Sequence, residues 1–115
     1  MAVDIKQYFM YYSTPIPAEN VFFLTEEMLD DLYANPSETE RFNVFFHLQN
    51  EYFFLKNNNQ LEEAAYLCYL ISYYLFIPLT PPHSDVLALE FAKKAVELNL
   101  NDKYNDWLKL VKKGN

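Results

Sequence analysis

The stretch 59–77, which reads NQLEEAAYLCYLISYYLFI, most constrains what this chain can fold into. It carries no charged residue after Glu63 and is followed directly by Pro78. Asn59 can cap a first helical turn with Glu62 in a capping-box relation, and a proline interrupts the hydrogen-bond ladder of a helix. The uncharged run is shorter than the roughly 20 residues that span a bilayer. We therefore predict a central buried helix over 59–77, with no membrane span.

This predicted helix has two apolar faces, because successive helical residues are about 100° apart. The aliphatic face contains Ala64, Leu67, Cys68, Leu70, Ile71 and Leu75, and the aromatic face contains Tyr66, Tyr69, Tyr73 and Phe76. A helix that is apolar on both sides is normally the core of a bundle. The tyrosine face admits two interpretations: a second core layer with hydroxyls at its rim, or a partner-binding surface, since tyrosine is favoured at interfaces.

The composition favours helices throughout. A chain of 115 residues suits one domain, 1–115, that buries roughly two-thirds of its surface. Apolar residues make up 51% of it, and the single glycine, Gly114, leaves few residues for tight β-turns. We predict an all-α, single-domain bundle of five or six helices with antiparallel hairpins. The one cysteine, Cys68, excludes a disulfide within the chain and suits a reducing cytoplasm.

Capping residues mark the helices on both sides of the central one. We expect Thr25 to cap a helix that ends before Asn35, and Ser37 with Glu40 to form a capping box for a helix over 38–56. Ser84 should cap a helix over 85–98 that carries a row of small residues, and Asn101 with Asp102 should cap the last. We also expect a short helix over 2–12 and a helical turn over 17–24.

The helix over 38–56 is expected to have a broad apolar side, made of Phe42, Phe45, Phe46, Leu48, Tyr52, Phe53 and Leu55. Phe54 falls outside this arc and is a candidate interface residue. The asparagines at 57–59 make a short connection, so this helix and the central one should form an antiparallel hairpin.

Negative charge is concentrated in the first half of the chain. Residues 1–63 hold eleven acids and three bases, a balance of −8, whereas residues 64–115 hold five acids and six bases, a balance of +1. The candidate partner-binding acids are Glu26, Glu27, Asp30 and Asp31, continued by Glu38 and Glu40. An acidic field repels nucleic acid and attracts cationic proteins. We therefore expect a cationic protein partner and no nucleic-acid partner.

No residue pattern indicates catalysis, a cofactor or a metal. His47 and Glu51 are one helical turn apart, but without a third ligand they are expected to be a solvent-facing polar pair. The adjacent residues His83, Ser84 and Asp85 cannot by themselves form the convergent geometry of a nucleophilic triad. Phosphate-cradling glycine loops are excluded by the glycine count. The prediction is a protein that is not an enzyme.

The segment ALEFAKKAVELNLND, residues 88–102, resembles the second helix and exit of a tetratricopeptide repeat. Ala88 and Ala95 match the two small positions, and Leu98 matches a core position. The start of the central helix, 61–64, is also similar to such a helix, and Trp107 resembles the opening of a following one. Leu100 replaces the usual proline, and the 24 residues between Ala64 and Ala88 are fewer than the repeat period of 34. This resemblance implies antiparallel helix pairs and, as one function, an adaptor or chaperone that binds a peptide in an apolar groove.

In size, acidity and aromatic content the chain is also similar to the small immunity proteins of bacterial toxin systems, including contact-dependent inhibition. That resemblance implies a cytoplasmic inhibitor that covers a basic toxin of the nuclease class. We take this as the first function hypothesis and the adaptor as the alternative. Salt separates the two, because binding through charges weakens strongly with ionic strength and binding in an apolar groove is much less sensitive to it.

Overall fold

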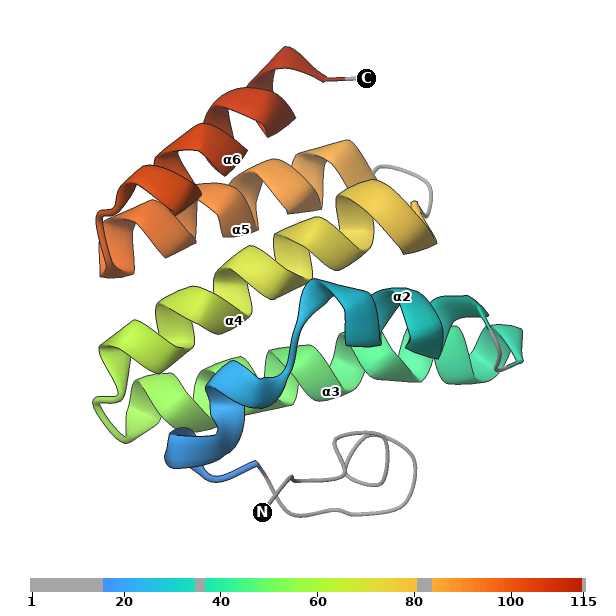
Figure 1. The fold of residues 1–115 in the computed structure, drawn as a ribbon, viewed down its shortest axis with the longest axis horizontal. Coiled ribbons are helices and arrows are strands. Elements are labelled where there is room, and N and C mark those ends of the chain that lie inside the picture. Colours follow the sequence, from blue (N-terminus) through green and yellow to red (C-terminus); the bar gives the residue numbers. More distant parts are fainter. Residues whose placement is uncertain (1–15, 35–36, 81–83, 115) are drawn as a thin grey trace.

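The computed structural model describes residues 16–34, 37–80 and 84–114, and these form an all-α bundle without strands. Figure 1 shows α3, α4, α5 and α6 as consecutive antiparallel neighbours, with α2 and the short helix η1 crossing one face. The elements are the 3-10 helix η1 (Ala18–Phe23), α2 (Glu26–Ala34), α3 (Glu38–Asn57), α4 (Leu61–Tyr74), the π-helix η2 (Leu75–Leu79), α5 (Ser84–Leu98) and α6 (Asp102–Lys113). The predicted all-α bundle with antiparallel hairpins is confirmed. The helix expected over 2–12 lies outside the described residues.

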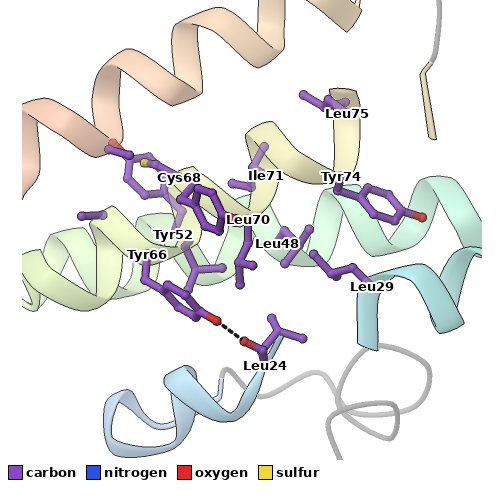
Figure 2. Close-up of a cluster of buried hydrophobic side chains, with 14 of the residues drawn as sticks. Leu24, Leu29, Leu48, Tyr52, Tyr66, Cys68, Leu70, Ile71, Tyr74 and Leu75 are labelled. Carbon is purple, nitrogen blue, oxygen red and sulfur yellow. Dashed lines mark hydrogen bonds between the residues drawn. The ribbon is translucent and has the colours of Figure 1, made fainter. Parts of the chain in front are cut away.

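Helix α4 is the centre of the bundle, as its sequence predicts. It packs against α3 on one side and α5 on the other, and these two interfaces are the most extensive in the bundle. The aliphatic residues Leu67, Leu70 and Ile71 are fully buried, and Figure 2 shows Leu70 and Ile71 with Leu48 of α3. Burial raises the pKa of the Cys68 thiol to about 12, so this cysteine packs as a small apolar side chain. No described helix is long and apolar enough to cross a membrane.

The start of α4 differs from the prediction, because Asn59 ends the preceding helix instead of capping this one. Asn59 has a left-handed backbone with φ of 59°. The N–H of Gln60 donates to the carbonyl of Leu55 at 2.9 Å, and the N–H of Asn59 donates to that of Lys56 at 3.1 Å. This pair of bonds is a Schellman motif, and asparagine tolerates its left-handed position better than most residues. The cap position of α4 is Gln60, which makes no side-chain capping bond.

The end of α4 also differs, because Pro78 does not stop the helix. The chain continues as the π-helix Leu75–Leu79, which includes Pro78, and it leaves the helical path at Thr80 with φ of 38°. A proline ring clashes with the carbonyl four residues earlier in an α-helix. The wider π-turn changes that spacing and accommodates the ring while the chain stays helical.

Helix α3 faces the core with a different side from the one predicted. Val44, Leu48 and Leu55 are fully buried, whereas three phenylalanines expected in the core are exposed. Their exposed fractions are 36% for Phe42, 59% for Phe46 and 52% for Phe53. Apolar residues lie on every side of α3, so their spacing in the sequence does not identify the side that faces the core.

Most of the predicted caps are confirmed. The hydroxyl of Thr25 accepts from the N–H of Met28, Ser37 and Glu40 form the reciprocal capping box, and the Asn101 carboxamide oxygen accepts from the N–H of Tyr104 at 2.9 Å. Ser84 is instead the first residue of α5. The small residues Ala88, Ala92 and Ala95 of α5 are fully buried, which lets α5 lie close to α4.

Candidate functional site

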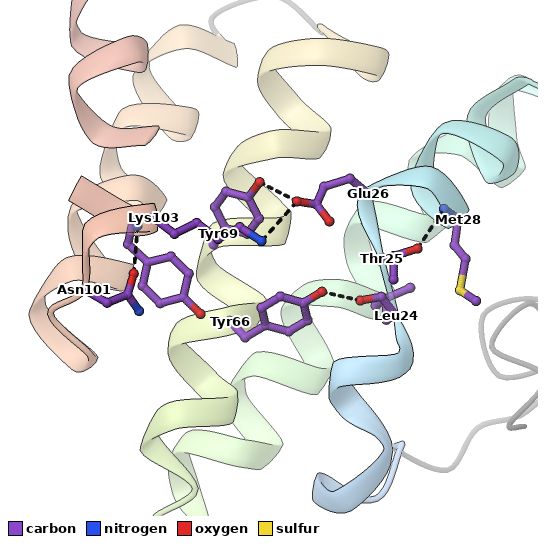
Figure 3. Close-up of polar contacts among 9 residues, drawn as sticks. Leu24, Thr25, Glu26, Met28, Tyr66, Tyr69, Asn101 and Lys103 are labelled. Atoms are coloured by element: carbon purple, nitrogen blue, oxygen red, sulfur yellow. Dashed lines mark hydrogen bonds and ion pairs between the residues drawn. The ribbon is translucent and has the colours of Figure 1, made fainter. Parts of the chain in front are cut away.

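The tyrosine row of α4 faces α2, and each hydroxyl finds an acceptor there or just before it. Tyr66 donates to the carbonyl of Leu24 (2.5 Å), Tyr69 to Oε2 of Glu26 (2.6 Å) and Tyr73 to Oδ1 of Asp30 (2.8 Å). The first two bonds are drawn in Figure 3. The donor and acceptor numbers rise together along the two helices, so α2 and α4 run parallel. The hydroxyls thereby fix the position of α2 on α4.

Glu26 is the most constrained acid of this contact. Besides the Tyr69 hydroxyl, it meets Nζ of Lys103 from α6 at 3.4 Å, so it joins three helices (Figure 3). Partial burial raises the pKa of its carboxyl, but the Tyr69 hydroxyl, its own backbone and Lys103 together lower it below the ordinary value. Burial and the charged acceptor raise the pKa of the Tyr69 hydroxyl. Glu26 is therefore ionised and paired.

Some of the predicted partner-binding acids make contacts within the protein, and others are exposed on its surface. Glu26 and Asp30 accept bonds from α4, and Glu40 is part of the Ser37 capping box. Glu27 and Asp31 are exposed on α2. The side chain of Glu38 lies outside the described residues.

The aromatic candidates also separate by burial. Tyr66 and Tyr69 are 8% and 6% exposed, so they form the second core layer, and Tyr73 is half-buried at the rim. Phe54 is 37% exposed, which confirms its expected place outside the core. Residues of η1, α2 and α6 pack against the tyrosine row.

Trp107 of α6 closes the other side of the row, a role that the sequence did not reveal. Its ring packs edge-on against Tyr69 and Phe76, and its Nε1 donates to the hydroxyl of Ser72 at 2.7 Å. The Ser72 hydroxyl donates in turn to the carbonyl of Ala88 at 2.7 Å, which joins α4, α5 and α6. A shallow surface pocket of about 290 Å³ lies beside this ring, lined by Tyr69, Lys103, Asp106, Trp107 and Leu110. Its lining holds no convergent catalytic set.

The expected solvent-facing pair of His47 and Glu51 is wrong for Glu51, which is only 4% exposed. Its Oε1 accepts from the N–H of Ile16 at 2.6 Å, and its Oε2 is buried without a hydrogen-bond partner. Burial raises the pKa of this carboxyl to about 7, against a smaller lowering by the Ile16 N–H. His47 is half-buried, and burial lowers the pKa of its imidazole. The described residues contain no group of three acids, histidines or cysteines that could hold a metal ion.

No protein-family model, curated protein or solved structure matches this chain significantly. The arguments about function therefore depend on the residues and their geometry.

Proposed function

We propose that this chain is a non-enzymatic binding domain that neutralises a cationic protein, of the nuclease toxin class, through the acidic face of α2. The observation that carries the proposal is the charge of this helix: four of its nine residues are acids and none is basic. Glu26 with Asp30, and Glu27 with Asp31, are like-charge pairs four residues apart. Each such pair destabilises a helix by about 0.2–0.5 kcal/mol.

Contacts inside the protein engage the inner acids of α2. Lys103 pairs with Glu26, and the tyrosine hydroxyls are neutral donors to Glu26 and Asp30. Glu27 and Asp31 stay on the exposed side of the helix. A partner with a row of lysines or arginines would be attracted to the acids exposed on α2. A nuclease offers such a surface where it binds nucleic-acid phosphates.

The test is co-expression with the protein encoded by the neighbouring reading frame, which the proposal requires to be cationic and toxic. The native chain should restore growth, and the E27K/D31K variant should not. The matched control is E62K/E97K, which changes the net charge equally at exposed acids on α4 and α5. Circular dichroism checks that each variant is folded. Equal rescue by E27K/D31K and the native chain would refute the acidic face as the binding surface.

Salt dependence distinguishes this function from that of an adaptor. Affinity through α2 should fall steeply between about 0.05 M and about 0.5 M NaCl, because the Debye length shortens severalfold over that range. An adaptor needs an open apolar groove, and the tyrosine row that would line it is covered by η1, α2 and α6.

A further inference from the structure

Three exposed phenylalanines of α3 form a stripe along its outer side. Phe42, Phe46 and Phe53 are separated by four and seven residues, which places them within about 40° of one another around the helix axis. The buried residues Val44, Leu48 and Leu55 point the opposite way. None of the three phenylalanines belongs to the buried core cluster. Aligned exposed aromatic residues of this kind mark interaction surfaces.

The surroundings of the stripe carry almost no charge. Between Arg41 and Lys56 the chain has one charged residue, Glu51, and its carboxyl is buried on the core side. The amides Asn43, Gln49, Asn50 and Asn57 are among the exposed or half-buried neighbours of the stripe, and the exposed Lys56 borders one of its ends, three residues after Phe53. This neutrality is unusual in a chain with a net charge of −7. A cationic partner gains nothing from it.

We propose that the phenylalanine stripe of α3, made of Phe42, Phe46 and Phe53, docks a second copy of this chain as an antiparallel α3–α3 pair. In a two-fold interface the same patch faces itself, so any charge in it would meet its own kind. Two copies with seven net negative charges each can approach without that repulsion along the neutral outer side of α3. A second copy also supplies an equally neutral, equally apolar surface.

The spacing of the stripe suits two-fold symmetry. An axis between Gln49 and Asn50 places Phe46 opposite Phe53 of the second copy, because both lie three to four residues from that centre. Amide side chains carry donors and acceptors, so those at the axis can pair with their own copies. The contact on either side of the axis is then a ring against a ring.

The available area predicts a weak dimer. From the exposed fractions, the three rings together expose about one and a half phenylalanine side chains, roughly 300 Å² in each copy. With the amide flanks, the interface would bury on the order of 1,000 Å² in total, at the lower end of specific interfaces. We expect a dissociation constant on the order of 10–100 μM. A larger buried area would give a lower dissociation constant.

The experiment is sedimentation equilibrium of the full chain from about 1 to about 500 μM. The native mass should rise from 13.7 kDa towards twice that value. F46E should raise the dissociation constant about tenfold or more, because a dimer carries the change twice. Leu100 is 71% exposed at the α5–α6 connection, so L100E is the control and should leave the constant unchanged. Circular dichroism confirms that the variants are folded.

A charge exchange makes the test specific for the register. F53K alone should weaken the dimer, and F46E/F53K should restore it to within about threefold of native, since each acid then faces a base across the axis. Added salt should leave native dimerisation unchanged or strengthen it, the reverse of its effect on binding through α2. A chain that stays monomeric to about 500 μM, or a dimer that F46E does not weaken, would overturn the proposal without affecting the proposed function.

Discussion

Replacing the buried carboxyl of Glu51 with an amide should remove a large pH dependence of stability. The Oε1 atom of Glu51 accepts from the Ile16 N–H, which a glutamine oxygen can still do, while Oε2 is buried without a partner. Glu51→Gln therefore preserves the shape and the hydrogen bond and removes the ability to ionise. Leaving one amide N–H₂ unpaired costs about as much as leaving the protonated carboxyl unpaired.

The magnitude follows from the shift in pKa. Folding raises the pKa of Glu51 from 4.5 to about 7, so the folded protein binds this proton more tightly than the unfolded chain does. The resulting stabilisation is fully present below pH 4.5, falls by up to about 1.4 kcal/mol per pH unit, and is lost above pH 7. Over the whole range the loss amounts to about 3 kcal/mol. The glutamine variant has no such loss.

The assay is urea unfolding of the native chain and of Glu51→Gln at intervals from about pH 4.5 to about pH 8.5. Taking the difference between the two proteins cancels the other ionisable groups. The variant should match the native chain within about 1 kcal/mol at the acidic end and exceed its stability by about 3 kcal/mol at the alkaline end. A constant difference for Glu51→Gln across this pH range would refute the burial argument.

Three further predictions concern contacts that hold the helices. Tyr69→Phe should lower the free energy of unfolding in urea by about 1–3 kcal/mol, because it removes a hydrogen bond to the charged Glu26. Tyr73→Phe removes an exposed hydrogen bond and should cost less than about 1 kcal/mol. Ala92→Leu should cost about 1–3 kcal/mol, since Ala92 is fully buried and a larger side chain there overpacks the core; a stability equal to native would contradict that packing. Ser37→Ala should cost about 1 kcal/mol because it removes the hydroxyl that accepts from the Glu40 N–H, while the Ser37 N–H keeps its bond to Glu40 Oε1; an unchanged urea midpoint would show that the hydroxyl contributes nothing.

Helix positions were predictable where a side chain signals them locally. Thr25, Ser37 and Asn101 each bond a backbone N–H within three residues, so neighbouring residues decide where those helices begin. Asn59 was misplaced because asparagine serves equally well before a helix and in a left-handed position after one. The surrounding backbone bonds, which the sequence does not contain, decide between these roles.

The rotation of α3 could not be read from its residues. Apolar side chains lie all round this helix, so placing Phe46 in the core and Glu51 in solvent was the reading that hydrophobicity favours. Both were wrong, and for one reason: the contacts with α4 and with Ile16 turn a different side of α3 inward. The buried carboxyl of Glu51 is the group for which we expect pH-dependent stability. The exposed phenylalanines of α3 form the surface for which we expect self-association.

The acids of α2 and the tyrosines of α4 lie far apart in the sequence, but in the structure they contact each other. The hydroxyls of Tyr69 and Tyr73 donate to Glu26 and Asp30 on the inner side of α2. Near the C-terminal end of α2, Nε of Arg41 donates to the carbonyl of Tyr33 at 2.6 Å. A helix held at several points presents its outer acids in a fixed arrangement, which reduces the entropy lost on binding. The variant Y69F/Y73F, which leaves every charge in place, should therefore weaken binding to the cationic partner under conditions where the protein is fully folded. Unchanged affinity in calorimetry would show that the position of α2 does not matter for binding and that the net charge alone attracts the partner.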